Sequence, residues 1–161
     1  MIAPIVALLA GAAMLAQQAP ASRPVLVSVT TRVSAERITP GQRFQVTVDL
    51  EPSSGIHVYA PDVVRYRPIA VTVRPQAGMA LVGAPRYPAA ETYYYAPLKE
   101  TVPVYQKPFR VVQEVALERS AKPGSTISVA GILSYQACDD RICYPPRTLP
   151  LTWTVRVKEA S

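Results

Sequence analysis

The sequence predicts a single-domain β-sandwich, and three observations support this all-β class. Apolar and polar residues alternate over many short segments, which is typical of strands with one buried face. The 161 residues include 17 prolines, about twice the average usage of roughly 5%, and proline inside a helix removes a hydrogen bond and clashes with the preceding turn. A hydrophobic content of 49% with 17% charged residues is that of one globular core.

The first 16 residues are apolar and carry no charged side chain. This stretch is shorter than the roughly 20 residues that cross a bilayer as a helix, and Ala16 and Ala19 are candidate cleavage sites. We therefore expect a signal peptide over residues 1–19, a linker over residues 20–27 and one domain over residues 28–158. Because no Lys or Arg precedes the apolar stretch, an uncleaved anchor and a mis-assigned start stay open as alternatives.

The expected strands of the domain follow one another at short intervals. In the first, Val25, Val27 and Val29 share one face. A Pro-Gly turn at residues 39–42 precedes the next strand, because proline presets its φ and glycine turns freely. The apolar face of that strand consists of Phe44, Val46, Val48 and Leu50. Four further segments are mostly bounded by Pro or Gly, and we expect strands at residues 56–60, 69–74, 102–105 and 110–118.

The last two strands show the clearest alternation. One face of the first carries Ile127, Val129, Leu133 and Tyr135. One face of the second carries Leu149, Leu151, Trp153, Val155 and Val157. We expect these strands to pair as a hairpin. Cys138 and Cys143, which lie between them, then sit at one end of a sheet.

The formal net charge of +6 comes from basic residues that are scattered along the chain. A nucleic-acid-binding protein usually concentrates them on one face or stripe, so we expect no nucleic-acid partner. A dispersed basic surface suits acidic protein partners.

Four residues separate the two cysteines. In an exported protein such a pair is a structural staple, a redox couple or part of a metal site. A bond that closes so short a loop removes little entropy from the unfolded chain, roughly 2–3 kcal/mol, and the flanking hairpin already holds the two ends together. Small, accessible bridges stay reducible. The spacing alone leaves the redox and staple interpretations open.

A metal site would need further ligands. Two cysteines at this separation lie at the wide edge of zinc spacing, His57 is the only histidine, and Asp139 and Asp140 are the carboxylates beside the pair. A site of two thiolates, an imidazole and a carboxylate is uncommon. We expect no metal and no cofactor.

The charges around the two sulfur atoms predict which of them is more reactive. The thiolate is the attacking species, and a neighbouring carboxylate disfavours it while a guanidinium favours it. Asp139 follows Cys138 directly, whereas Arg141 lies two residues before Cys143. Cys143 is therefore the expected nucleophile, although the same charges would also suit a loop that simply faces water.

Residues 134–147 read SYQACDDRICYPPR, which resembles the active-site segment of the N-terminal domain of DsbD-type thiol:disulfide interchange proteins. The sequences GIHVYAP at residues 55–61 and VPVY at residues 102–105 resemble other recurring segments of that family. The resemblance covers about residues 30–157. It implies an immunoglobulin-like sandwich of about seven to nine antiparallel strands with the cysteine pair at one end.

The resemblance also implies a function. The pair would take electrons from a thioredoxin-like donor and pass them to oxidised periplasmic proteins, with Cys143 linked to the partner and Cys138 as the resolving thiol. We expect an extracytoplasmic, bacterial thiol:disulfide oxidoreductase of the protein-disulfide reductase type that acts as a monomer. Because the sequence contains neither the multi-helix membrane domain nor the thioredoxin domain of the full-length family member, we expect a thioredoxin-like protein or membrane thiol reductase to supply electrons in trans.

The family shields its pair with an aromatic cap loop, for which residues 91–97 are the candidate here, and tunes the pair through nearby tyrosines. The residues expected to tune or cap the pair are His57, Tyr59, Tyr93, Tyr94, Tyr95, Tyr135, Asp139 and Arg141. Packing of the three consecutive tyrosines on an edge strand is the alternative to a cap. A non-catalytic interaction module with a structural disulfide is the alternative function.

Overall fold

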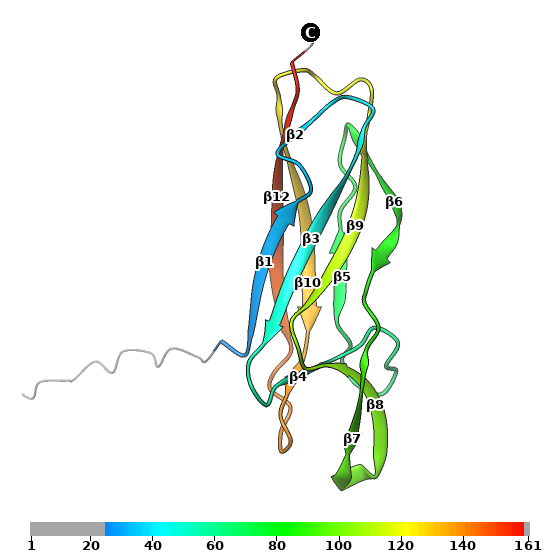
Figure 1. Cartoon of the computed structure of the whole chain (residues 1–161), viewed down its shortest axis with the longest axis vertical. Coiled ribbons are helices and arrows are strands. Elements are labelled where there is room, and N and C mark those ends of the chain that lie inside the picture. The colour runs from blue at the N-terminus through cyan, green and yellow to red at the C-terminus, as the bar shows by residue number, and fades with distance from the viewer. Residues whose placement is uncertain (1–24, 160–161) are drawn as a thin grey trace, which may run out of the picture.

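The computed structural model describes residues 25–159, so the predicted signal peptide and most of the predicted linker lie outside it. The chain is all-β and forms an elongated β-sandwich, as expected, with a third small sheet at one end (Figure 1). Within the described residues no helix is long and apolar enough to cross a membrane.

The first sheet of the sandwich is antiparallel and has the strand order β1-β3-β9-β6. Its strands are β1 (Val27–Val33), β3 (Arg43–Pro52), β6 (Met79–Arg86) and β9 (Phe109–Leu117). The four apolar residues predicted for one face of β3 are all buried, which confirms the alternation found in the sequence. The turn before β3 also forms as expected, since the N–H of Gln42 donates to the carbonyl of Thr39 and Gly41 has a φ of +83°.

The second sheet has the strand order β2-β12-β10-β5. Its strands are β2 (Arg37–Ile38), β5 (Ala70–Val73), β10 (Thr126–Tyr135) and β12 (Arg147–Val157). β10 pairs antiparallel with β12 over the full length of β10, which confirms the predicted hairpin. The short pairing of β2 with β12 is parallel, so the expected purely antiparallel arrangement was wrong at this edge.

The two sheets pack around Trp153 of β12. Its indole Nε1 donates a 2.8 Å hydrogen bond to the carbonyl of Thr47 in β3, which ties the sheets together inside the core. Gly131 of β10 leaves room for the indole, because a Cβ at this position would lie 2.8 Å from the Trp153 ring and 2.9 Å from the carbonyl oxygen of Thr72. Burial of each large apolar side chain in this core contributes about 1.5–3 kcal/mol.

The third sheet, of order β11-β4-β8-β7, forms the lower end of the molecule in Figure 1. Its strands are β4 (His57–Tyr59), β7 (Glu91–Tyr95), β8 (Glu100–Tyr105) and β11 (Ala137–Cys138), and the 3-10 turn η1 (Ala96–Leu98) joins β7 to β8. Lys99 closes this turn in the left-handed region, with a φ of +52°. The β7–β8 hairpin projects beyond the sandwich (Figure 1).

The two faces of the third sheet belong to different cores, because successive side chains of a strand point to opposite sides. Val58, Tyr105 and Ala137 share one face and pack into the main core. The opposite face contributes to a second cluster of buried residues, which we call the small cluster. It consists of Tyr59, Val63, Val102, Val104 and Cys138, with Tyr66 and Tyr93 packed against it.

Residues 25–159 form twelve strands, so the expected number of seven to nine was too low. The strands β2 and β11 are two residues long, which is too short for an alternation to be recognised. β6 contains Gly83 and Pro85 near a break in its register with β9, and both residue types weaken a strand signal. Val25 was assigned to the face of Val27, but it precedes β1 and is 70% exposed.

Candidate redox site

Cys138 and Cys143 form a disulfide, with their Cα atoms 4.0 Å apart. Cys138 is the last residue of β11 and is only 1% exposed, because it belongs to the small cluster. Cys143 lies in the loop after β11 and is exposed. One sulfur atom of the bond is thus held by a strand inside the protein, while the other belongs to a residue at the surface.

Asp139 organises the loop between the two cysteines. Its Oδ1 atom accepts hydrogen bonds of 2.8 Å from the backbone N–H groups of Arg141 and Ile142, and its Oδ2 atom accepts one of 2.9 Å from the hydroxyl of Tyr144. The bonds from Ile142, Arg141 and Tyr144 lower the pKa of the carboxyl below its ordinary value, since each favours the charged form. The carboxylate that we expected to act on the Cys138 thiol is therefore engaged in holding the loop.

Backbone hydrogen bonds complete this loop. The N–H of Asp139 donates to the carbonyl of Ile142, and the N–H of Tyr144 donates to the carbonyl of Ala137, both at 2.9 Å. The side-chain amide of Gln136 donates to the carbonyl of Tyr144, also at 2.9 Å. These hydrogen bonds join the two ends of the loop in addition to the disulfide.

His57 of β4 lies directly opposite Cys138 of β11 in the register of the third sheet. It is 2% exposed, and neither ring nitrogen has a hydrogen-bond partner within residues 25–159. Burial lowers the pKa of the imidazole below its ordinary value, and the negative charges of Asp140 and Asp139, which raise it, only partly offset this effect. The ring is therefore neutral near neutral pH. A buried polar group left without a partner costs about 1–3 kcal/mol, and such a group calls for an explanation.

Tyr59, two residues after His57, points to the same face of β4. Its hydroxyl oxygen lies 4.0 Å from the Cys143 sulfur, at the outer limit of hydrogen bonding to sulfur. Tyr66 stacks on its ring at a centroid distance of 4.2 Å, and the Tyr66 hydroxyl donates to a carboxylate oxygen of Glu100. Burial and the charge of Glu100 raise the pKa of Tyr59 to about 12, so its hydroxyl stays protonated beside the disulfide.

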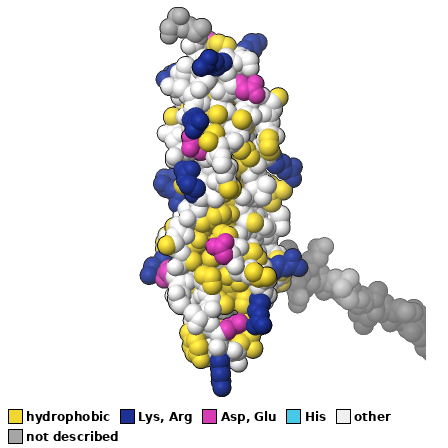
Figure 2. Space-filling view, turned by 90° about the vertical axis from the view of Figure 1, so that its right-hand side faces the viewer, with side chains coloured by type: hydrophobic (Ala, Val, Ile, Leu, Met, Phe, Trp, Pro, Cys, Tyr) yellow, Lys and Arg dark blue, Asp and Glu magenta, His cyan; other side chains and the backbone are white. Residues whose placement is uncertain are grey.

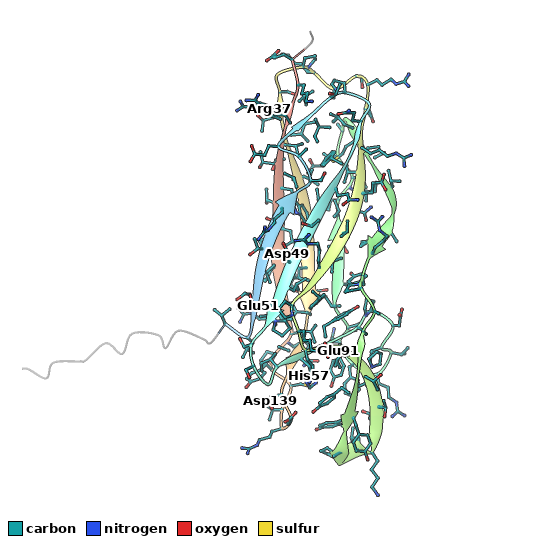
Figure 3. All side chains as sticks on the ribbon, in the orientation of Figure 1. Arg37, Asp49, Glu51, His57, Glu91 and Asp139 are labelled. Atoms are coloured by element: carbon teal, nitrogen blue, oxygen red, sulfur yellow. A yellow bond between two sulfur atoms is a disulfide. The ribbon has the colours of Figure 1, made fainter. Side chains whose placement is uncertain are left out.

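Tyr93 of β7 covers the pair from the other side. Its ring packs on His57 at a centroid distance of 4.5 Å, and its hydroxyl donates a 2.7 Å hydrogen bond to Oδ1 of Asp140. This hydrogen bond, together with partial burial, raises the pKa of Tyr93 to about 12. Figure 3 shows His57 between the loop that carries Asp139 and the β7–β8 hairpin. Tyr93 therefore connects the hairpin to the cysteine loop.

The consecutive tyrosines at residues 93–95 do not all face the pair. β7 is an edge strand of the third sheet, so its side chains alternate between the two faces. Tyr93 and Tyr95 lie on the side of the small cluster and are half-buried, whereas Tyr94 points away and is 59% exposed. The segment expected to form the cap is therefore an edge strand, and its role as a cap stays a prediction.

The structure brings together only part of the predicted set. His57, Tyr59, Tyr93 and Asp139 surround the cysteine pair, and Arg141 contributes its backbone N–H to the loop. Tyr135 is buried in the main core, on the far side of the third sheet from the small cluster. Tyr66, Glu100 and Tyr144 also contribute to the site and were not predicted from the sequence, and Asp140 was considered only as a possible metal ligand. Tyr144 adjoins Cys143 in the sequence, whereas no local pattern marks Tyr66 or Glu100.

Ligand-type residues do not form a metal site in the described part of the chain. Within residues 25–159 there is no group of three or more His, Cys, Asp or Glu side chains with the geometry to hold a metal ion.

Exposed apolar side chains lie at the same end of the molecule as the disulfide. Ile142, next to Cys143, is 56% exposed, and Leu98 at the tip of the β7–β8 hairpin is 62% exposed. Figure 2 shows hydrophobic side chains gathered over the lower part of one face, while Lys and Arg side chains are spread along the molecule.

Residues 23–152 match the family described as "Thiol:disulfide interchange protein DsbD, N-terminal". A search of curated protein sequences gives no match.

Solved structures with a similar arrangement of strands share little sequence with the chain. BcpA, the major pilin subunit of Bacillus cereus, is 11% identical with a TM-score of 0.46, and the match covers 83% of this chain and 40% of the pilin. A family 123 glycoside hydrolase from Clostridium perfringens is 7% identical with a TM-score of 0.32, over 80% of this chain and 27% of the hydrolase. The chain thus spans less than half the length of either protein. Similarity at this level says nothing about function.

We predict that Asp139→Ala loosens the cysteine loop, because the carboxylate accepts hydrogen bonds from two backbone N–H groups and one hydroxyl there. In the oxidised protein the amides of Arg141 and Ile142 should lose their protection from hydrogen exchange. Asp140→Ala is the matched control, since Asp140 bonds Tyr93 rather than these amides. The same two amide resonances should titrate in the wild type with a midpoint below the ordinary value of 3.8, because the bonds last until the carboxylate is protonated. Unchanged protection in Asp139→Ala would contradict this role.

Proposed function

We propose that this chain, which belongs to the family of the N-terminal domain of the thiol:disulfide interchange protein DsbD, is an electron relay that exchanges disulfides with partner proteins. A thioredoxin-like donor would reduce its disulfide, and oxidised extracytoplasmic proteins would accept the two electrons. The enzyme class is thiol:disulfide oxidoreductase, and Cys138 and Cys143 are the proposed catalytic residues.

The observation that carries this proposal is the unequal exposure of the two cysteines. In disulfide exchange a thiolate attacks one sulfur of the partner's disulfide and expels the other as a thiolate. Cys143 is exposed and can meet a partner, whereas Cys138 is 1% exposed. Attack by Cys143 would form a mixed disulfide, and attack by Cys138 on the Cys143 sulfur would then release the partner as a dithiol. The chain is left with its own disulfide, so two electrons and two protons have passed to the partner.

The loop around Cys143 also supports a redox bond over an inert staple. Asp139 and the backbone bonds between Ala137 and Tyr144 already hold the loop. A covalent link there adds little to stability, since it closes a very short loop. A bond that the fold does not need can be broken and remade without loss of structure.

The β7–β8 hairpin is the proposed cap. Tyr93 covers the His57 side of the pair and is held by Asp140 of the cysteine loop. The hydroxyl of Tyr59, which keeps its proton near neutral pH, can donate to a thiolate on Cys143 and favour it. We assign Tyr59 and Tyr93 to tuning and covering the pair, and leave Tyr94 and Tyr135 without a role in it.

Partners would dock at the end of the molecule that carries Cys143. Ile142 and Leu98 offer apolar contact area there, and the net charge of +6 favours acidic partners through long-range attraction. We propose that the chain acts outside the cytoplasm after signal-peptide cleavage, because the family match begins at residue 23, after the apolar leader. We also propose that it acts as a monomer. We further propose that the sandwich is of the immunoglobulin-like class.

We predict that Cys138→Ser traps a mixed disulfide with a thioredoxin-like protein, because Cys143 still attacks while the resolving thiol is missing. Cys143→Ser is the matched variant and should trap little, since its remaining thiol lies inside the small cluster. Non-reducing electrophoresis with mass spectrometry of the adducts measures both.

Adducts found mainly on Cys138 would reverse the assignment of the two cysteines. If neither variant forms an adduct with any thioredoxin-like protein tested, exchange chemistry itself is excluded for these partners.

A further inference from the structure

His57 is a buried titratable side chain that has no hydrogen-bond partner among residues 25–159. Within this part of the chain neither ring nitrogen is paired and the residue is 2% exposed, whereas buried polar groups are nearly always hydrogen-bonded. Tyr93 packs on the ring and Tyr59 meets it edge-on, at centroid distances of 4.5 and 5.4 Å. These two aromatic rings fix the position of the imidazole without using its nitrogens.

Cys138 lies directly opposite His57 across the third sheet. It is paired with His57 in the antiparallel register of β4 and β11, and side chains of such a pair share a face with Cβ atoms about 4.5–5.5 Å apart. In the disulfide state the Cys138 sulfur has no proton to donate. In the dithiol state its S–H is a donor, and a neutral imidazole nitrogen is an acceptor, one that has no other partner in the described part of the chain.

We propose that His57 is the general base of the resolving step, in which it takes the proton of the Cys138 thiol. This inference rests on the proposed function. As the S–H bond of Cys138 breaks, its proton passes to a ring nitrogen of His57 and the sulfur attacks the Cys143 sulfur of the mixed disulfide. The bond between Cys143 and the partner breaks, and the partner leaves as a thiolate. His57 then returns its proton to the solvent or to the departing sulfur, so that protons and electrons balance.

The other titratable groups around His57 are less suited to this role. Asp139 is engaged with its own loop, and Asp140 accepts from Tyr93. Tyr59 and Tyr93 keep their protons, with pKa values of about 12. Burial lowers the pKa of His57 below its ordinary value of 6.5, so the ring stays neutral and able to accept a proton at and somewhat below neutral pH.

The test uses the reduced protein and the aromatic disulfide dithiobis(nitrobenzoate), whose thiol product is coloured. Release of the first equivalent of coloured thiol reports attack by Cys143 on the reagent, and its rate depends on the reagent concentration. Release of the second equivalent reports resolution by Cys138, and its rate does not depend on the reagent concentration because this step is intramolecular. General base catalysis contributes about 10²–10⁴-fold, and we expect the second phase at pH 7 to slow by at least about tenfold in His57→Phe and in His57→Gln. Phe keeps the ring packing, and Gln keeps a hydrogen-bond acceptor that cannot take the proton.

The pH profile separates a base from a structural residue. In the wild type the rate of the second phase should decrease at acidic pH, because His57 becomes protonated there. The pH at which this decrease begins should lie below 6.5. In both variants the rate should instead rise with pH and approach the wild-type rate above the ordinary thiol pKa of about 8.5, since the thiol then ionises without help. The first phase serves as the internal control and should be nearly unchanged.

Three results would overturn the inference: an unchanged second phase in both variants, an equal slowing of both phases at every pH, or a wild-type profile without the decrease at acidic pH. The last of these needs no variant and so does not depend on variant folding. If the wild type releases only one equivalent, the exchange function fails. If it releases two and the variants match it, only the role of His57 fails.

Discussion

The pairing of β11 with β4 is the constraint on which the site depends. Ala137 opposite Val58 and Cys138 opposite His57 fix a register in which alternate side chains point to opposite faces. Ala137 and Val58 join the main core, while Cys138 enters the small cluster. A slip of one residue would send Cys138 into the main core and Ala137 to the site. The same backbone pairing therefore anchors the third sheet to the sandwich and places the buried sulfur.

The remaining features of the site follow from this placement. Because Cys138 ends a strand inside the protein, the short loop after it has to carry Cys143 back to the surface, and Asp139 supplies the acceptors that fold this loop. The β7–β8 hairpin extends the same sheet and so places Tyr93 over His57. The result is a bond between one buried and one exposed cysteine, which is the asymmetry on which the proposed ordered exchange relies.

The sequence predicted those parts of the structure that depend on local patterns. Alternation in β3, β10 and β12 identified buried faces, and the position of the cysteines between the last two long strands located the site at one end. The short strand β11 and the contacts of Tyr66 with Tyr59 and Glu100 were not predictable, because they depend on residues that are distant in the chain. Asp139 was identified by its position next to Cys138. Its hydrogen bonds within the loop were not predicted, because they depend on the three-dimensional arrangement of the loop and not on charge alone.

A redox titration shows whether the Cys138–Cys143 bond is reversibly reducible in the folded protein, as the proposed function requires. The protein would be equilibrated in glutathione buffers of increasing reducing power, and the fraction of dithiol measured by thiol alkylation and mass spectrometry. We expect a single two-electron transition with a midpoint between about −300 and −120 mV, the range of thioredoxin-like partners and their relatives, with the fold intact on both sides. A bond that resists reduction until the protein is denatured would contradict the proposed function and identify the disulfide as structural.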